Sequence, residues 1–139
     1  MSTSPSDFNA RIIDEFRANE GRVGPPFVGT PLLLLHHTGA RSGRSYVNPL
    51  AYLRDGDRYV IFASKAGASS NPDWYHNLKA HPEVEVEVGT ETIPVRADQA
   101  EGEERERLFS AQAERSPAFA DYQEKAGGRL IPVIVLTPR

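Results

Sequence analysis

The chain has 139 residues, no cysteine and a formal net charge of −3. This length fits one domain with a real core, and the lack of cysteine excludes disulfides, thiolate chemistry and cysteine-bound metals. The mild charge argues against nucleic acid, no apolar run is long enough to cross a bilayer, and residues 1–10 do not resemble a signal peptide, so we expect a cytoplasmic protein.

An amphipathic helix is predicted at residues 5–20. Its apolar residues Phe8, Ile12, Ile13 and Phe16 recur at helical spacing among charged residues of both signs. The mixed charges favour packing on the protein's own core over attachment to a membrane surface. Peripheral membrane contact through this helix is the alternative.

Three strand-like runs follow, at residues 32–38, 45–53 and 58–63. The turn signals "GARSGR" and "RDGD" separate them, so we expect an antiparallel meander. A further hairpin is predicted where the alternating run Glu83–Val88 turns back into residues 91–97. Pro94, in the second of its strands, indicates a sheet edge or a bulge.

Residues 102–113 have a helical pattern and a high density of charge. Glu101/Arg105 and Glu103/Arg107 stand at i,i+4 spacing, which is typical of a solvated face. A short helix is expected after Ser116, before a last strand at residues 130–136. Strands interrupted by helices, without alternating βαβ units, predict an α+β protein built on an antiparallel barrel or sandwich.

The stretch "SKAGASSNPDWYHNL" follows the third strand and leads from small residues into a helix. Asn71 can cap that helix and Pro72 suits its first turn. The free N–H groups of such a helix start, with Lys65 upstream, could hold an anionic group. A plain loop leading to a helix that packs through Trp74 and Leu78 is the simpler interpretation.

Two arginines, Arg41 and Arg44, lie in the turn between the first two strands. In a meander this turn could lie beside the loop that contains Lys65, so that several cations surround one phosphate or carboxylate. Exposed turn residues without a ligand are the alternative interpretation.

Neither a metal site nor a self-sufficient catalytic group is evident. His36 and His37 are adjacent in a predicted strand and must point to opposite faces, so they cannot form one chelate. We expect one of them to pack and the other to hydrogen bond, and we assign no metal. If the protein is an enzyme, a bound cofactor would carry the difficult chemistry.

Phe119 and Tyr122 stand three residues apart and share a face of the short helix predicted after Ser116. They are either core contacts or the lining of a pocket for a planar substrate, where the Tyr122 hydroxyl would orient a carbonyl or nitro oxygen.

These motifs together are similar to the deazaflavin-dependent nitroreductases, the actinobacterial family that uses coenzyme F420. The match comprises "LLLLHHTGARSGRSYVNPL", "ASKAGASSNPDWYHNL", "YQ" and "IPVIVLTP", in the family's order. The resemblance implies an α+β split β-barrel of about six mainly antiparallel strands with flanking helices. We therefore expect an N-terminal helix at residues 1–20 and a single F420-binding domain at residues 21–139.

The resemblance also implies the site residues. Arg41 would meet the anionic tail of F420, with Arg44 as its neighbour. Ser64, Lys65, Ala66 and Gly67 match the loop beside the deazaflavin, and Trp74 and Asn77 match the helix on the phosphate side.

On the acceptor side, Ser116, Phe119 and Tyr122 match the substrate helix, and Tyr122 and Ser64 are the candidate hydrogen-bond donors in catalysis. Ser116 and Phe119 stand where nitroimidazole-activating members carry tyrosines. The missing hydroxyls should change acceptor choice more than cofactor binding.

Two departures concern the tail of the cofactor. Ala40 replaces the first basic residue of the family's turn, and Tyr46 stands where an arginine is common. The tail would then be held more weakly, or chiefly by Arg41 and Arg44.

The resemblance implies an F420H2-dependent oxidoreductase that passes hydride to a quinone or another planar, electron-poor acceptor, nitroaromatics included. An FMN-dependent enzyme of the same barrel and a non-catalytic F420 carrier are the alternatives. A homodimer is expected because split barrels often dimerise, and the predicted partner is a small-molecule acceptor.

Overall fold

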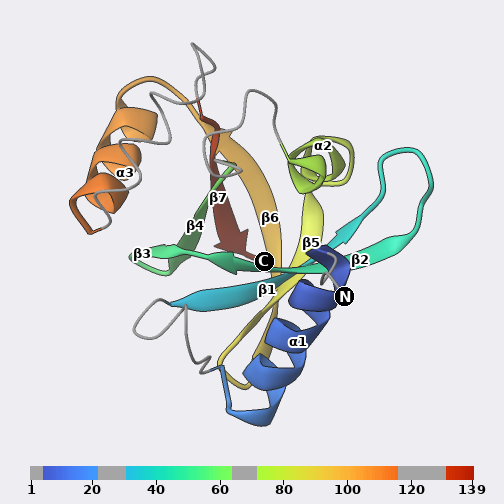
Figure 1. Cartoon of the computed structure of the whole chain (residues 1–139). Helices are drawn as coiled ribbons and strands as arrows, with labels where there is room; N and C mark the ends of the chain where they lie inside the picture. Colours follow the sequence, from blue (N-terminus) through green and yellow to red (C-terminus); the bar gives the residue numbers. More distant parts are fainter. Residues whose placement is uncertain (1–4, 22–30, 64–71, 116–130) are drawn as a thin grey trace.

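A computed structural model describes residues 5–21, 31–63, 72–115 and 131–139 (Figure 1). It contains three helices and seven strands in these ranges: α1 (Pro5–Ala18), β1 (Leu32–Thr38), β2 (Ser45–Ala51), β3 (Leu53–Asp55), β4 (Arg58–Phe62), α2 (Asp73–Ala80), β5 (Glu83–Val88), β6 (Glu91–Ala100), α3 (Gly102–Arg115) and β7 (Val133–Pro138). None of these helices is long and apolar enough to cross a bilayer.

The strands form one antiparallel sheet in the order β2-β1-β5-β6-β7-β4-β3, curled into a half-barrel (Figure 1). The predicted α+β split barrel is confirmed, with one strand more than expected. The run at residues 45–53 becomes two strands because the chain changes neighbours at Tyr52. β2 pairs with β1, whereas β3 pairs with β4.

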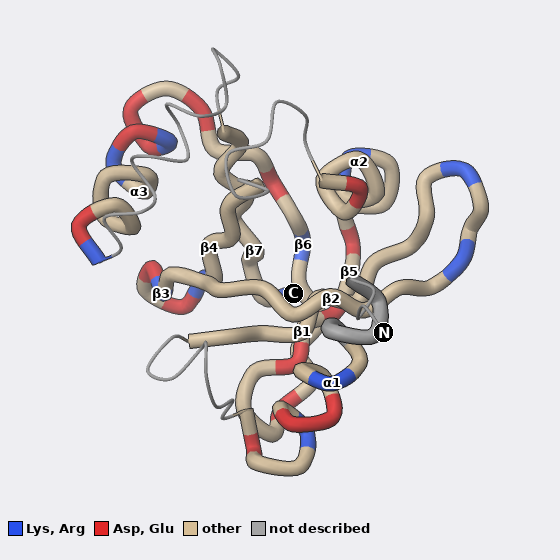
Figure 2. Tube along the Cα trace, in the orientation of Figure 1, with Lys and Arg blue, Asp and Glu red and all other residues tan. Residues whose placement is uncertain are grey.

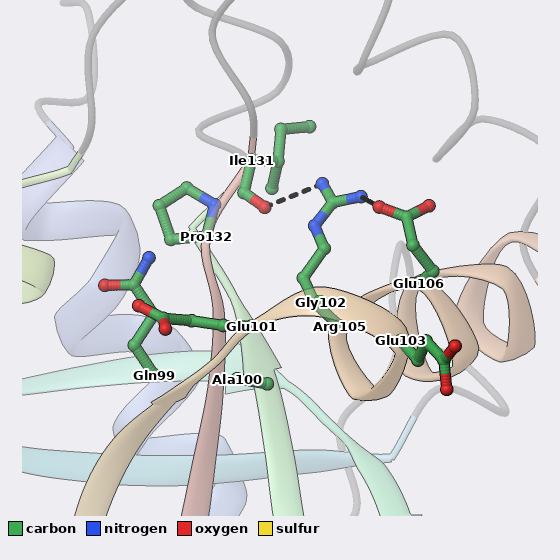
Figure 3. A pocket seen from close by; sticks show the side chains of 9 residues that line it. All are labelled: Gln99, Ala100, Glu101, Gly102, Glu103, Arg105, Glu106, Ile131 and Pro132. Carbon is green, nitrogen blue, oxygen red and sulfur yellow. Dashed lines mark hydrogen bonds and ion pairs between the residues drawn. The ribbon is translucent and has the colours of Figure 1, made fainter.

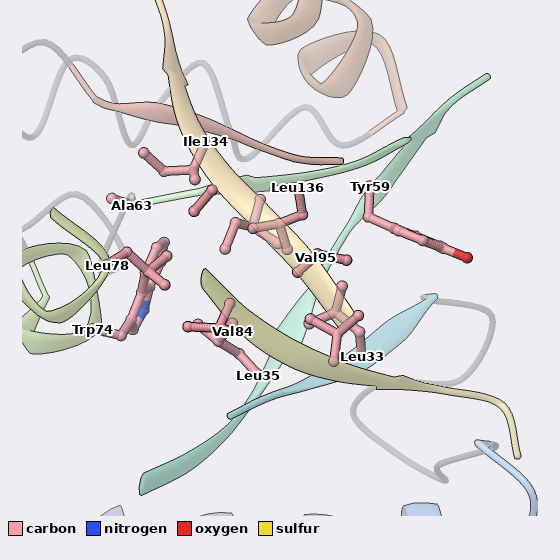
Figure 4. Packing of buried hydrophobic residues seen from close by; sticks show 13 residues of the cluster. Leu33, Leu35, Tyr59, Ala63, Trp74, Leu78, Val84, Val95, Ile134 and Leu136 are labelled. Carbon is pink, nitrogen blue, oxygen red and sulfur yellow. The ribbon is translucent and has the colours of Figure 1, made fainter. Parts of the chain in front are cut away.

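The inner face of the curled sheet holds the main core. Leu33 and Leu35 of β1 are fully buried there with residues of β4 to β7. Trp74 and Leu78 of α2 pack onto the same cluster from the side of that helix (Figure 4). Full burial of such apolar side chains stabilises the fold by about 1.5–3 kcal/mol each. The core therefore fixes the position of α2 against the end of β1.

Two helices cover the outer face, and this explains the continuous apolar runs in the sequence. Ile12 and Phe16 of α1 are buried against Leu32 and Leu34 of β1. Leu108 of α3 packs with outward residues of β3, β4 and β7. The expectation that the N-terminal helix lies on the core is therefore confirmed for α1, whereas the division of the chain at residue 20 stays a prediction.

Charged residues on the outer face link the helices to the sheet. Arg17 of α1 donates to Glu87 of β5 at 2.6 Å, and His36 of β1 contacts the same carboxylate at 2.7 Å. Arg107 of α3 donates to Asp55 at 3.2 Å. Both links join segments more than fifty residues apart, so they fix the places of α1 and α3.

The expected solvated face of α3 was partly wrong. Arg105 is only 5% exposed and donates to the carbonyl of Ile131 at 2.8 Å. Arg107 pairs with Asp55 and not with Glu103. The cause is tertiary, because α3 turns both arginines toward strand and loop partners that helix spacing alone does not reveal.

Pro94 lies within β6, beside the end of its pairing with β7. Its carbonyl accepts from the N–H of Arg139, just beyond the last β6–β7 pair, Val95 and Pro138. The proline nitrogen points the same way as that carbonyl, toward the side where β7 ends. The predicted sheet edge or bulge was wrong, because β6 lies between β5 and β7 and pairs with both in a continuous register. The proline removes a donor only where the β6–β7 pairing ends.

Candidate functional site

A pocket of about 900 Å³ lies where the end of β1, the turn that follows it, the start of β2 and the first turns of α2 meet. Residues from all four segments line it: His37, Gly39, Ala40, Arg41, Ser42, Tyr46, Asn48, Pro72, Asp73, Trp74, His76 and Asn77. The turn that carries Arg41 therefore lies beside the start of α2, whereas the loop that contains Lys65, beside which the turn was predicted to lie, is outside the described residues.

The turn between β1 and β2 is closed by its own backbone. The N–H of Gly39 donates to the carbonyl of Arg44 at 2.8 Å, and Ser42 Oγ accepts from the N–H of Arg44 at 3.2 Å. Gly43 has a φ of +69°, which favours glycine. The turn carries basic residues and no acidic ones (Figure 2), and the side chain of Arg41 is exposed on it.

Asn77, a buried residue of α2, is hydrogen bonded to this turn. The N–H of Ala40 can only donate, so Asn77 Oδ1 accepts from it at 2.9 Å. The amide nitrogen of Asn77 then donates to His37 Nδ1 at 3.0 Å. The other ring nitrogen of His37 donates to Asn48 Oδ1 at 2.6 Å. A neutral imidazole with its proton on Nε2 satisfies every group in this chain.

The environment of His37 supports the neutral form. Burial lowers the pKa of His37 below its ordinary value, although the hydrogen bond to Asn48 opposes the shift. The ring is 5% exposed and stacks on Tyr46, with centroids 5.5 Å apart. Tyr46 is itself 42% exposed and lines the pocket, so an aromatic face stands beside the arginine turn.

The helix start differs slightly from its prediction. α2 begins at Asp73, and Pro72 occupies the N-cap position without a side-chain cap, whereas we expected Pro72 inside the first turn. Asn71, the expected cap, lies outside the described residues. Asp73 adds a carboxylate to the pocket wall, where the positive end of the helix stabilises it.

The predicted site residues divide into three groups. Arg41, Trp74 and Asn77 line the pocket, although Trp74 also belongs to the core and Asn77 is buried in the hydrogen-bond chain. Arg44 is exposed on the same turn but does not line the pocket. The others lie outside the described residues: Ser64, Lys65, Ala66, Gly67, Ser116, Phe119 and Tyr122.

Sequence reasoning missed His37, Tyr46, Asn48 and His76 as pocket residues. The signal for His37 was present, because it continues the inward series of Leu33 and Leu35 at a spacing of two. It both packs and hydrogen bonds, while His36 on the other face also hydrogen bonds. Within the described ranges no three metal-binding side chains gather.

A second pocket, of about 650 Å³, lies between the end of β6, the start of α3 and the residues before β7 (Figure 3). Arg105 crosses it, donating to Ile131 at 2.8 Å and to Glu106 at 3.0 Å. The first bond ties α3 to the chain before β7, and the second lies within α3. Its polar contacts are therefore those of a structural junction.

The chain is similar to known proteins of one family. The model of the family described as F420H(2)-dependent quinone reductase matches residues 10–138. The chain belongs to this family. The F420H(2)-dependent quinone reductase Rv1261c of Mycobacterium tuberculosis H37Rv is 41% identical over 128 residues, which cover 89% of this chain and 85% of that protein.

Two solved structures are similar to this chain over most of its length. An F420-H2 dependent reductase, FDR-A, is 40% identical, with a TM-score of 0.70 over 76% of this chain and 93% of that chain. A domain-swapped dimer is 37% identical, with a TM-score of 0.71 over 96% and 99%. The predicted family and fold are confirmed, and the predicted F420-dependent oxidoreductase is confirmed at the level of the family.

Proposed function

We propose that this chain is an F420H2-dependent oxidoreductase that reduces a quinone or another planar, electron-poor acceptor, and that its pocket holds the anionic part of F420. The observation that carries the proposal is the shared pocket of the Arg41 turn and the start of α2, in a chain of this family. Bound F420H2 would supply the hydride.

The residues of the pocket fit an anion through two donors. Arg41 makes no ion pair with a described residue, so its guanidinium is available to a phosphate or carboxylate in a forked geometry. The first N–H groups of α2 add the positive end of a helix. Asp73 opposes them, so we expect the anion to lie nearer to Arg41 than to this carboxylate.

The remaining site residues complete the proposal. Trp74 would form a rigid wall, because the core holds it in place. Ser64, Lys65, Ala66 and Gly67 are proposed for the loop beside the deazaflavin. Ser116, Phe119 and Tyr122 are proposed for the acceptor, where hydroxyl donors would orient an oxygen as its charge develops.

A fluorescence titration of the apo protein with oxidised F420, with FMN in parallel, tests the cofactor. Arg41→Ala and Arg44→Ala form a matched pair, since both remove an exposed arginine of one turn and only Arg41 lines the pocket. We expect the first to raise the Kd for F420 about tenfold, the cost of one charged hydrogen bond, and the second about twofold. Equal effects would contradict the placement of the anion.

Turnover tests the reaction. The wild type should oxidise F420H2 in the presence of a soluble quinone, with loss of the reduced deazaflavin followed by absorbance. Binding of FMN without F420 would favour the FMN enzyme. Binding of F420 without oxidation by any quinone would favour the carrier.

We also propose a homodimer, supported by the similarity to a domain-swapped dimer. Light scattering on the purified protein measures its mass directly, and a monomeric mass would contradict the proposal. The cytoplasmic location stays a prediction. Membrane contact through α1 would need another face of this helix, because Ile12 and Phe16 are buried against β1.

A further inference from the structure

The strongest unexplained feature of the pocket is a chain of hydrogen bonds centred on the buried side chains of His37 and Asn77. Three side chains from β1, β2 and α2 connect in series, from Asn48 through His37 to Asn77, and end on the backbone N–H of Ala40. Buried polar groups cost free energy unless they are paired, so a chain with every member satisfied holds its parts in one arrangement. Its last member is the residue directly before Arg41.

We infer that His37 is a positioning residue: in its neutral form it sets the amide of Asn77 so that Asn77 holds the Ala40–Arg41 backbone in the conformation that binds the anionic ligand. This inference rests on the proposed function, because the ligand considered is F420. His37 acts only through Asn77 and the turn, and it has no part in the chemical step.

Protonation shows why the neutral form matters. A proton on His37 Nδ1 would face the N–H groups of Asn77, which are donors too. The amide must then turn over to present its oxygen to the imidazolium. The N–H of Ala40 loses its acceptor in the same movement and meets a donor instead. The bond from α2 to the turn is therefore broken.

Other groups around His37 contribute to its charge balance. From α2, Asp73 favours the imidazolium, and His76 lines the same pocket. From β1, His36 disfavours it. Tyr46 of β2 stacks on the ring, and Arg41 of the turn lines the same pocket. Replacing His37 itself separates its effect from those of these neighbours.

The neighbouring histidine provides the matched control. His36 is adjacent on β1 but lies on the outer face, where it contacts Glu87. His37→Gln keeps a polar side chain that does not titrate near neutrality, and His36→Gln makes the same change on the face away from the pocket. F420 ionises in the same way in every experiment, so comparing the two variants also removes the effect of its own ionisation on the Kd.

The experiment measures the Kd for F420 from about pH 5 to pH 8, the range in which histidine titrates. In the wild type and in His36→Gln, we expect the Kd to rise about tenfold on acidification, as one hydrogen bond to the turn is lost. In His37→Gln this rise should be absent. The Asn48→Asp variant would place a carboxylate beside His37 and favour its imidazolium, so the rise in the Kd for F420 should occur at a higher pH.

A second measurement needs no cofactor. In the apo protein, the backbone amide resonance of Ala40 should shift with the same midpoint as the ring resonances of His37, and this shift should vanish in His37→Gln. An Ala40 resonance that ignores the protonation of His37 would overturn the inference. The inference would also be overturned if the Kd for F420 had the same pH dependence in the wild type and in His37→Gln. Absence of F420 binding at every pH would overturn the proposed function instead.

Discussion

Two adjacent histidines on β1 lie on opposite faces of the sheet, and their contacts differ in kind. His36 points outward, where Glu87 lies between it and the guanidinium of Arg17. His37 points inward and is part of a chain of neutral hydrogen bonds. Strand geometry alone separates them, since successive side chains alternate between faces.

The outer face uses ion pairs to hold helices on the sheet, whereas the inner pocket leaves a cation for a ligand. On the outer face, full charges pair with one another and hold α1 and α3 on the sheet. In the pocket, neutral amides and an imidazole form the hydrogen bonds that join β1, β2 and α2. Arg41 is not paired with any described carboxylate. A ligand can then use this cation without first breaking an ion pair. The predictions below test whether the two faces are energetically independent.

The largest effect is expected from Phe16→Ala on the outer face. Phe16 of α1 is 1% exposed and packs against β1, so its truncation should lower the free energy of unfolding by about 3–5 kcal/mol. The Kd for F420 should stay within about twofold where the variant is folded, because the pocket lies on the other face. Urea denaturation and fluorescence titration measure the two quantities. Ile13→Ala, at a partly buried neighbour, should cost less.

A smaller change is expected in the pocket from Asp73→Asn. Removing this carboxylate should lower the Kd for F420 about fivefold, since one repulsion at the protein surface is worth about 1 kcal/mol. The gain should shrink at high salt, where the charges are screened. Asp57→Asn, in the exposed turn between β3 and β4, is the control and should leave the Kd unchanged. An unchanged Kd in Asp73→Asn would place the anion away from the start of α2.

The local patterns of the chain predicted most of the fold. The alternating run Glu83–Val88 became β5 without a change of boundary, because its valines face the core and its glutamates face outward. The run at residues 45–53 was misjudged because a strand that changes partners at Tyr52 keeps the pattern of a continuous strand. Arg105 was misjudged because helix spacing does not show which tertiary partner a long side chain reaches.

The site was predictable to the extent that it depends on turns and helix ends. Arg41 was predicted from its turn, Trp74 and Asn77 were implied by the family resemblance, and all three line one pocket. The role of Asn77 was not visible, since the sequence gives no sign that its amide bonds to a histidine forty residues away. His37 and Asn48 meet only because β1 and β2 pair in a register that places Leu35 opposite Asn48. Such long-range pairing depends on the whole sheet.

The smallest effect concerns the outer ion pairs. The hydrogen bond from Arg17 and the contact with His36 hold the pKa of Glu87 below its usual range. A carboxyl with a lowered folded pKa stabilises the protein above its unfolded pKa, and this stabilisation is lost as the pH falls through the folded value. Glu87→Gln should therefore cost about 0.5–1 kcal/mol at neutral pH, and almost nothing once the wild-type carboxyl is protonated. Glu85→Gln, two residues earlier on the same face, should cost nothing measurable. A cost in Glu87→Gln that does not change with pH would show that the carboxylate acts through packing and not through charge.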